Sequence, residues 1–231
     1  MFKHAIIENW ADRAGEIEAI LNPVTRVDRI LAYQGQRINI NDYQSLILTG
    51  SPLFVTEPDS DKLISWEMGL VEQALKQDVP ILGVCFGHQL IAKVLGASVI
   101  HSNAPEVGWY KVKIIPGKTI PFLNHLEQTF EVFQYHFQEV YPDSELSHEV
   151  VAHSPRCYVQ AFQYGNAFGI QFHPEISPEK SREIFSEKST RESLLKKGVN
   201  IDAIAIEPKT QKDQAPRDDI FKRFVKFAES V

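Results

Sequence analysis

Cysteine is scarce in this chain, whose 231 residues contain only Cys85 and Cys157. Two cysteines cannot build the disulfide framework of a small secreted protein, so a reducing, cytoplasmic location is expected. Long hydrophobic runs are also missing, and no stretch of the sequence is long enough to span a membrane. The first ten residues, MFKHAIIENW, have an apolar part that is too short and too charged for a signal peptide.

An excess of positive charge is missing as well. The chain carries 24 Lys and Arg against 30 Asp and Glu, for a formal net charge of -6, which argues against nucleic acid or an anionic membrane as the main partner. It shows no internal repeat and no low-complexity tract. With 43% hydrophobic residues the chain can bury a sizeable core, and no domain boundary is evident. We therefore expect residues 1–231 to form a single domain.

Strands and helices are predicted to alternate in the first half of the chain. Short apolar runs predict buried strands, and apolar residues at helical spacing predict helices between them. The expected strands lie within 4–10, 43–52 and 79–84, and the expected helices lie within 11–22, 61–77 and 88–96. This order favours an α/β fold of the flavodoxin-like kind, with a mostly parallel central sheet flanked by helices.

The second half of the chain has a different pattern. From Trp109 to Phe172, β-branched and aromatic residues alternate with polar ones, which predicts several short strands and a small additional antiparallel region. Helices are expected again in the tail, with a charged and mobile surface loop around 207–218.

The pentapeptide GVCFG places Cys85 between a predicted strand and a predicted helix, with Gly83 and Gly87 on either side. This is the context of a nucleophile elbow, in which a sharp turn points the nucleophile toward the first amides of the helix. Those amides and the helix dipole favour a thiolate and can hold an oxyanion. The pentapeptide is equally compatible with a buried packing cysteine.

A base for this thiol is expected at the end of another strand, in FGIQFHPE. Proline at 174 keeps His173 extended, and residues two apart in an extended chain face the same side. His173 and Glu175 can therefore act as a base and its carboxylate partner, although the segment taken alone is more typical of a strand end with a turn proline and a solvated glutamate. Together with Cys85 they predict a Cys-His-Glu triad at the carboxyl edge of one sheet.

The stretch LILTGSP supplies a third element of the expected site. A strand there ends in a turn containing Gly50 and Ser51, whose backbone amides could join that of Phe86 in an oxyanion hole. An ordinary surface turn would have the same composition.

These motifs together resemble a class I glutamine amidotransferase domain. The resemblance covers most of residues 1–180 and rests on GVCFGHQLIAKVLGA, GIQFHPE and LTGSP, with EVGWYKV and FQYHFQEV between them. Within that superfamily the chain is similar to stand-alone, GMP-synthase-like proteins, a group that also includes γ-glutamyl peptide hydrolases.

The resemblance implies that Cys85 attacks a γ-carboxamide to give a γ-glutamyl thioester, while His173 moves the protons. It also implies that Gln89 and the backbone around Tyr135 and His136 contact the α-substituents of a bound glutamine. No metal or organic cofactor is implied. The substrate would be glutamine or another γ-glutamyl compound, and any synthetase that accepts the ammonia would be a separate chain.

Two segments depart from the family pattern. The oxyanion loop often has two glycines but here reads Gly50-Ser51-Pro52, and a His-Gly-Asp pattern is replaced by His136-Phe137-Gln138. The second departure leaves the substrate open. The hypotheses are therefore a glutaminase that serves a partner synthetase, a stand-alone γ-glutamyl peptide hydrolase, or a catalytically silent binding module of the same fold.

The remaining candidate ligands and nucleophiles are given structural interpretations. Cys157 is expected to be a buried structural residue. His148 and His153 lie five residues apart without further ligands nearby in the sequence, so no metal site is expected.

Overall fold

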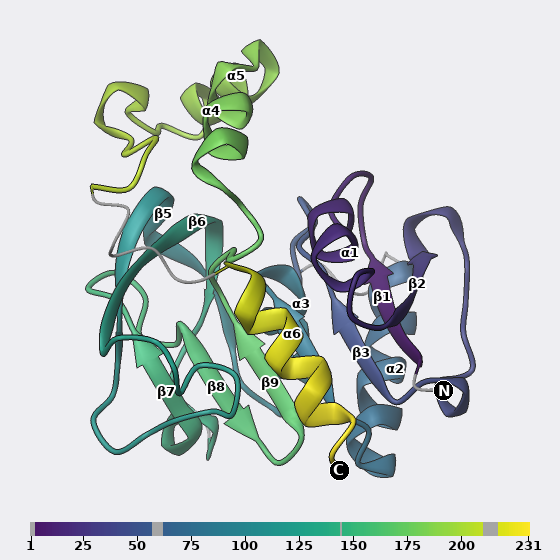
Figure 1. The fold of residues 1–231 in the computed structure, drawn as a ribbon. Helices are drawn as coiled ribbons and strands as arrows, with labels where there is room; N and C mark the ends of the chain where they lie inside the picture. The colour runs from purple at the N-terminus through teal and green to yellow at the C-terminus, as the bar shows by residue number, and fades with distance from the viewer. Residues whose placement is uncertain (1–2, 57–61, 144, 210–216) are drawn as a thin grey trace.

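The computed structural model describes residues 3–56, 62–143, 145–209 and 217–231, and its strands form one sheet (Figure 1). Within these ranges the order across the sheet is β2-β1-β3-β4-β9-β8-β7-β5-β6. The strands are β1 (Lys3–Glu8), β2 (Arg26–Leu31), β3 (Ser45–Leu48), β4 (Ile81–Val84), β5 (Val99–Ile114), β6 (Thr129–Val140), β7 (Val150–His153), β8 (Ala161–Tyr164) and β9 (Ala167–Ile170).

One half of the sheet is parallel and the other half is antiparallel. Neighbouring strands run parallel from β2 through β1, β3 and β4 to β9. From β9 onward, β8, β7, β5 and β6 pair in antiparallel fashion. The α/β class with flanking helices is confirmed, and the antiparallel part is more extensive than the alternation pattern suggests.

Helices cover both faces of the sheet. In Figure 1, α1 (Gly15–Leu21) and α6 (Arg217–Ala228) lie on the face toward the viewer, and α2 (Lys62–Gln77) and α3 (Phe86–Val94) lie behind it. Each face has its own buried apolar cluster, because side chains alternate between the two sides of a strand. None of the helices in the described ranges combines the length and the hydrophobicity needed to cross a bilayer.

A smaller unit extends from the end of the sheet formed by β5 and β6 (Figure 1). It contains α4 (Pro178–Ser186) and α5 (Lys188–Lys196), followed by a short 3-10 turn, η5 (Ile201–Ala203). A third apolar cluster, which includes Trp109, Phe133, Phe185 and Leu194, joins this unit to β5 and β6. The other 3-10 turns are η1 (Ala32–Gln34), η2 (Ile40–Asp42) and η4 (Glu145–Glu149).

The edge strand β2 had no counterpart among the strands expected from the sequence. Its six residues RVDRIL include three charged side chains, and of the six only Ile30 is buried. Arg29 forms a bidentate ion pair with the buried Glu8 of β1, at 2.8 Å from both Nε and Nη2. This long-range pairing stabilises a strand whose own residues do not show an apolar alternation.

Strands β5 and β6 are much longer than the short strands that the pattern predicts. β5 runs through Pro105 and Gly108, two residues that normally mark a turn. The pairing tolerates them because the register shifts between His101 and Glu106, and Gly108 adopts a φ of 108°. A Cβ at Gly108 would lie 2.6 Å from the carbonyl oxygen of Ala205, so glycine also allows the segment after η5 to pack against β5.

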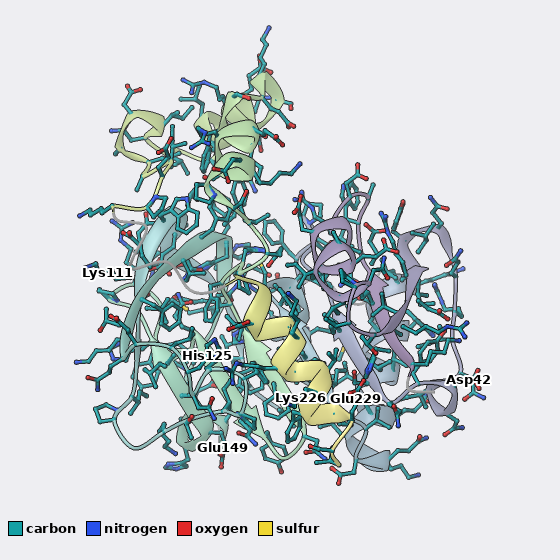
Figure 2. All side chains as sticks on the ribbon, viewed as in Figure 1. Asp42, Lys111, His125, Glu149, Lys226 and Glu229 are labelled. Atoms are coloured by element: carbon teal, nitrogen blue, oxygen red, sulfur yellow. The ribbon has the colours of Figure 1, made fainter. Side chains whose placement is uncertain are left out.

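The C-terminal helix is tied to the parallel half of the sheet. Glu229, labelled at the end of α6 in Figure 2, accepts a hydrogen bond from Thr25 and lies 3.3 Å from Nε2 of the buried His4 in β1. Ile220, Phe221 and Phe224 of α6 are fully buried against the sheet. Most of the charged loop expected at 207–218 lies outside the described residues.

Two glycines, one in a crowded position of β9 and one in an open position of α2, provide a matched test of the packing around the sheet. A Cβ at Gly169 would lie 2.3 Å from Phe162 Cε1 and 2.5 Å from His88 Nδ1, whereas a Cβ at Gly69 of α2 meets no atom within 4 Å. We expect Gly169→Ala to lower the free energy of unfolding by about 2 kcal/mol, and Gly69→Ala to raise it by about 0.5–1 kcal/mol. Urea denaturation followed by circular dichroism measures both, and equal effects of the two substitutions would contradict the close contacts found at Gly169.

Candidate active site

Cys85 lies in a strained turn between β4 and α3. Its φ of 52° and ψ of -101° fall outside the regions that non-glycine residues normally adopt. The turn is held by a 2.8 Å hydrogen bond from the Cys85 backbone N–H to the carbonyl of Ile170 in β9. Cys85 is the N-cap of α3, so its side chain stands at the helix end where the first backbone N–H groups have no partner within the helix.

The flanking glycines are required by close backbone contacts. A Cβ at Gly83 would lie 2.3 Å from the carbonyl carbon and oxygen of Gly87, and a Cβ at Gly87 would lie 2.6 Å from the carbonyl oxygen of Leu48. The turn can therefore close only if both positions lack a side chain. The sharp turn expected from the GVCFG pattern is therefore present, and it depends on the two glycines.

His173 approaches Cys85 because β4 and β9 are parallel neighbours. Val84 is paired with Ile170, so the residues that follow both strands emerge at the same edge of the sheet. The backbone N–H of His173 donates to the carbonyl of Phe133 in β6 at 2.9 Å, which fixes the position of the histidine. Its Nδ1 lies 2.6 Å from Oε1 of Glu175, so Nε2 is the ring nitrogen left for an exchange of protons with the thiol.

The electrostatic surroundings favour a protonated His173. Burial alone lowers the pKa of this imidazole, but the negative charges of Glu175 and Cys85 and their hydrogen bonds outweigh burial and raise the pKa to about 10. Its side chain is only 13% exposed, so water screens these interactions weakly. These interactions favour the imidazolium form of His173, which can donate a proton.

The loop after β3 borders the same space. A Cβ at Gly50 would lie 3.1 Å from Cε1 of His173 and 3.8 Å from Cβ of Cys85, so this loop approaches both side chains closely. Asn9 holds the start of the loop, because its Nδ2 donates to the carbonyl of Thr49 at 2.9 Å. The hydroxyl of Ser51 bonds within the loop, where it accepts a hydrogen bond from the backbone N–H of Leu53 at 3.2 Å.

The expected substrate-contact residues fall into two groups. The carbonyl of Tyr135 lies 3.9 Å from the sulfur of Cys85, so this backbone borders the site. The side chain of His136 points into a buried network, with Nε2 3.1 Å from Oε2 of Glu106. The side chain of Gln89 is also bound internally, since its Nε2 donates to the carbonyl of Gln138 and to Oε1 of Gln171.

Gln138 connects the network to the loop after β3. Its Oε1 accepts the N–H of Val55 at 3.2 Å and its Nε2 donates to the hydroxyl of Thr56 at 2.7 Å. Lys93 of α3 donates to the carbonyl of Val55 at 2.8 Å. Gln138, which departs from the family pattern, therefore positions this loop. Its residue type alone did not indicate that role.

The buried Glu106 is a second residue whose structural role the motifs did not indicate. It accepts hydrogen bonds from Ser154 at 2.7 Å and Gln160 at 2.6 Å, in addition to its contact with His136. The nearby Cys157 is buried, and burial together with the charges of Glu106 and Glu139 raises the pKa of its thiol well above the usual value. Among the described residues no three His, Cys, Asp or Glu side chains are grouped so as to hold a metal ion.

Comparison with known proteins places these features in a family context. The family model for glutamine amidotransferase class-I matches residues 2–191. A subunit of the glutamine-hydrolyzing GMP synthase of Sulfolobus acidocaldarius is 37% identical over 151 residues, which cover 63% of this chain and 75% of that protein. The protein of the same name from Saccharolobus solfataricus is 31% identical over 188 residues, covering 80% and 89%.

The fold has a counterpart among solved structures. A glutamine amidotransferase from Thermotoga maritima superimposes with a TM-score of 0.82 at 24% identity, and the alignment covers 100% of this chain and 99% of that one. At this identity the likeness concerns the arrangement of helices and strands.

The charge state of His173 can be measured directly. Glu175→Gln removes the carboxylate beside Nδ1, so we expect the pKa of His173 to fall by more than one unit, as followed by an NMR titration of the imidazole. A group whose pKa rises on folding stabilises the fold fully below its ordinary value of 6.5, and that stability is lost as the pH rises through about 10. The variant should therefore lose less stability than the wild type over this pH interval.

Glu179→Gln is the matched control for that titration, because Glu179 is an exposed carboxylate of α4 that pairs with Arg182. It should leave the pKa of His173 unchanged. An unshifted pKa in Glu175→Gln would contradict the electrostatic account of the pair.

Proposed function

The chain belongs to the class I glutamine amidotransferase family, and from this premise we propose that it hydrolyses the γ-amide of glutamine to glutamate and ammonia. The observation that carries the proposal is the convergence of Cys85, His173 and Glu175 at the edge shared by β4 and β9. In this proposal Cys85 is the nucleophile, His173 moves the protons and Glu175 holds the imidazole by its Nδ1–H.

The first half-reaction forms a thioester. The sulfur of Cys85 attacks the γ-carbonyl carbon while its proton resides on Nε2 of His173, and a tetrahedral intermediate with a negatively charged oxygen results. The raised pKa of His173 supports this step, because an imidazolium already holds the proton that the leaving nitrogen needs. Collapse of the intermediate breaks the C–N bond, and that proton leaves with ammonia.

The second half-reaction consumes water. The neutral His173 takes a proton from a water molecule, whose oxygen attacks the thioester carbon, and collapse returns the sulfur to Cys85 and releases glutamate. In both halves the developing oxyanion would accept hydrogen bonds from the backbone amides of Phe86 and of Gly50 or Ser51. The start of α3 and the approach of the loop after β3 support this assignment.

We further propose that residues 1–231 act as a single amidotransferase domain that delivers ammonia to a separate synthetase chain. Its relatives are named as subunits of glutamine-hydrolyzing GMP synthases, a name that describes one part of an assembly. The packing of α6 against the sheet supports one structural unit that extends beyond the residues matched by the family model.

The proposal predicts a specific pattern of glutaminase activity. Wild-type protein, assayed with and without a synthetase chain of the GMP synthase type, should release glutamate and ammonia from glutamine. Cys85→Ala should lower kcat by about 10³-fold or more, because the covalent step is lost. Cys157→Ala removes the other thiol and should retain activity, so it serves as the matched control.

The same assay separates the alternative functions. The substitution of Phe137-Gln138 for the family pattern leaves γ-glutamyl peptides as a second substrate class, and a strong preference for γ-glutamyl dipeptides over glutamine would identify a stand-alone peptide hydrolase. Absence of hydrolysis on both substrates under both conditions would leave a catalytically silent binding module and refute the proposed glutaminase.

A further inference from the structure

Residues of β5 and β6 and the segment that follows α5 line an open groove. Its volume is about 860 Å³, and its walls come from strands, from the loop after β3 and from the turn after α5. Aromatic rings form much of the lining: Phe54, Tyr110 and Phe137, together with the imidazole of His101.

Lys197 brings a positive charge to one side of this groove. Its Nζ lies 4.1 Å from the centre of the Phe137 ring and 5.6 Å from that of Phe54. Burial lowers the pKa of this ammonium group. Within the described ranges no carboxylate lies within ion-pair distance of Lys197, and the faces of these two rings help to stabilise its charge.

Arg156 brings a second positive charge from the turn between β7 and β8. Its guanidinium carbon lies 5.3 Å from the centre of the Tyr110 ring, and Nη1 donates to the hydroxyl of Tyr110 at 3.2 Å and to the carbonyl of Pro105 at 3.4 Å. These partners are neutral, and both contacts use Nη1. The guanidinium is therefore oriented while its charge is not compensated by a carboxylate of the described residues.

The charges of the groove contrast with those of the whole chain. The chain is acidic, with 30 Asp and Glu against 24 Lys and Arg, but among the described residues the lining of the groove contains Arg156 and Lys197 and no carboxylate. Two cations held over rings attract an anion, and the aromatic walls favour an apolar or planar body attached to it. We propose that this groove binds a small organic anion that carries a carboxylate or phosphate on a planar or apolar body.

The groove is separate from the Cys85 site but shares two backbone segments with it. Phe54 belongs to the loop that carries Gly50 and Ser51, and Phe137 lies two residues beyond Tyr135, with 6.1 Å between their ring centres. The proposal concerns binding alone, so it does not depend on the proposed hydrolysis of glutamine.

Lys197 would also be favoured at its position without any ligand, because it is the C-cap of α5 and a cation stabilises the negative end of a helix. Lys196 shares this helix end without lining the groove. Arg191 of the same helix is likewise an exposed cation outside the groove. The Arg191→Gln, Lys196→Gln double variant is therefore a matched control. Like the Arg156→Gln, Lys197→Gln variant, it removes one arginine and one lysine charge.

Titrations followed by ligand-observed NMR test the proposal on the full-length protein. Phenyl phosphate and hippurate supply an aromatic body with a phosphate or a carboxylate, whereas inorganic phosphate and benzyl alcohol supply the anion or the body alone. We expect at least one of the two aromatic anions to bind saturably, and to bind more tightly than inorganic phosphate or benzyl alcohol. The tighter of the two identifies phosphate or carboxylate as the preferred group.

The variants locate the binding site. The Arg156→Gln, Lys197→Gln double variant should weaken binding of the aromatic anion by at least 10-fold, and the Arg191→Gln, Lys196→Gln variant should leave it unchanged. The Arg156→Lys, Lys197→Arg variant keeps both charges and should retain most of the binding, which separates loss of charge from misfolding. The proposal would be overturned if neither aromatic anion bound the wild type saturably, if neither bound more tightly than inorganic phosphate and benzyl alcohol, or if the two neutralised variants showed equal losses.

Discussion

The site depends on the tight turn between β4 and α3. The backbone approaches so closely there that a side chain at Gly83 would collide with the backbone of Gly87, and a side chain at Gly87 would collide with that of Leu48. This approach forces Cys85 into a conformation that costs about 1–3 kcal/mol, a cost that the surrounding packing must offset. The hydrogen bond from Cys85 to Ile170 shows where that support arises, because it ties the strained residue to the neighbouring strand.

The remaining parts of the site follow from the neighbours of that turn. Because β9 is parallel to β4, its chain emerges beside Cys85 and carries His173 and Glu175 with it. The antiparallel half of the sheet then contributes β6, whose Phe133 carbonyl holds the backbone of His173 and whose Gln138 holds the loop after β3. Parallel strands thus bring the candidate catalytic side chains together, and the antiparallel strand β6 helps to fix their positions.

Much of this arrangement could be predicted from local sequence patterns. The glycines around Cys85 and the proline after His173 are local signals, and each indicates a backbone conformation without reference to the rest of the fold. The strand β2 and the full length of β5 gave no such signal, because they depend on the Arg29–Glu8 ion pair and on a register shift around Pro105. The functions of Gln138 and Glu106 were equally hidden, since their partners lie tens of residues away in the sequence.

The central claim is that the thiol of Cys85 is an activated nucleophile in a pocket that recognises glutamine. Mass spectrometry of protein treated with 6-diazo-5-oxo-L-norleucine, a reactive analogue of glutamine, tests both halves of this claim at once. The account predicts a covalent adduct on the peptide that contains Cys85, suppressed by excess glutamine and absent from Cys85→Ala. Unmodified Cys85 after treatment, or equal labelling of Cys157, would contradict it.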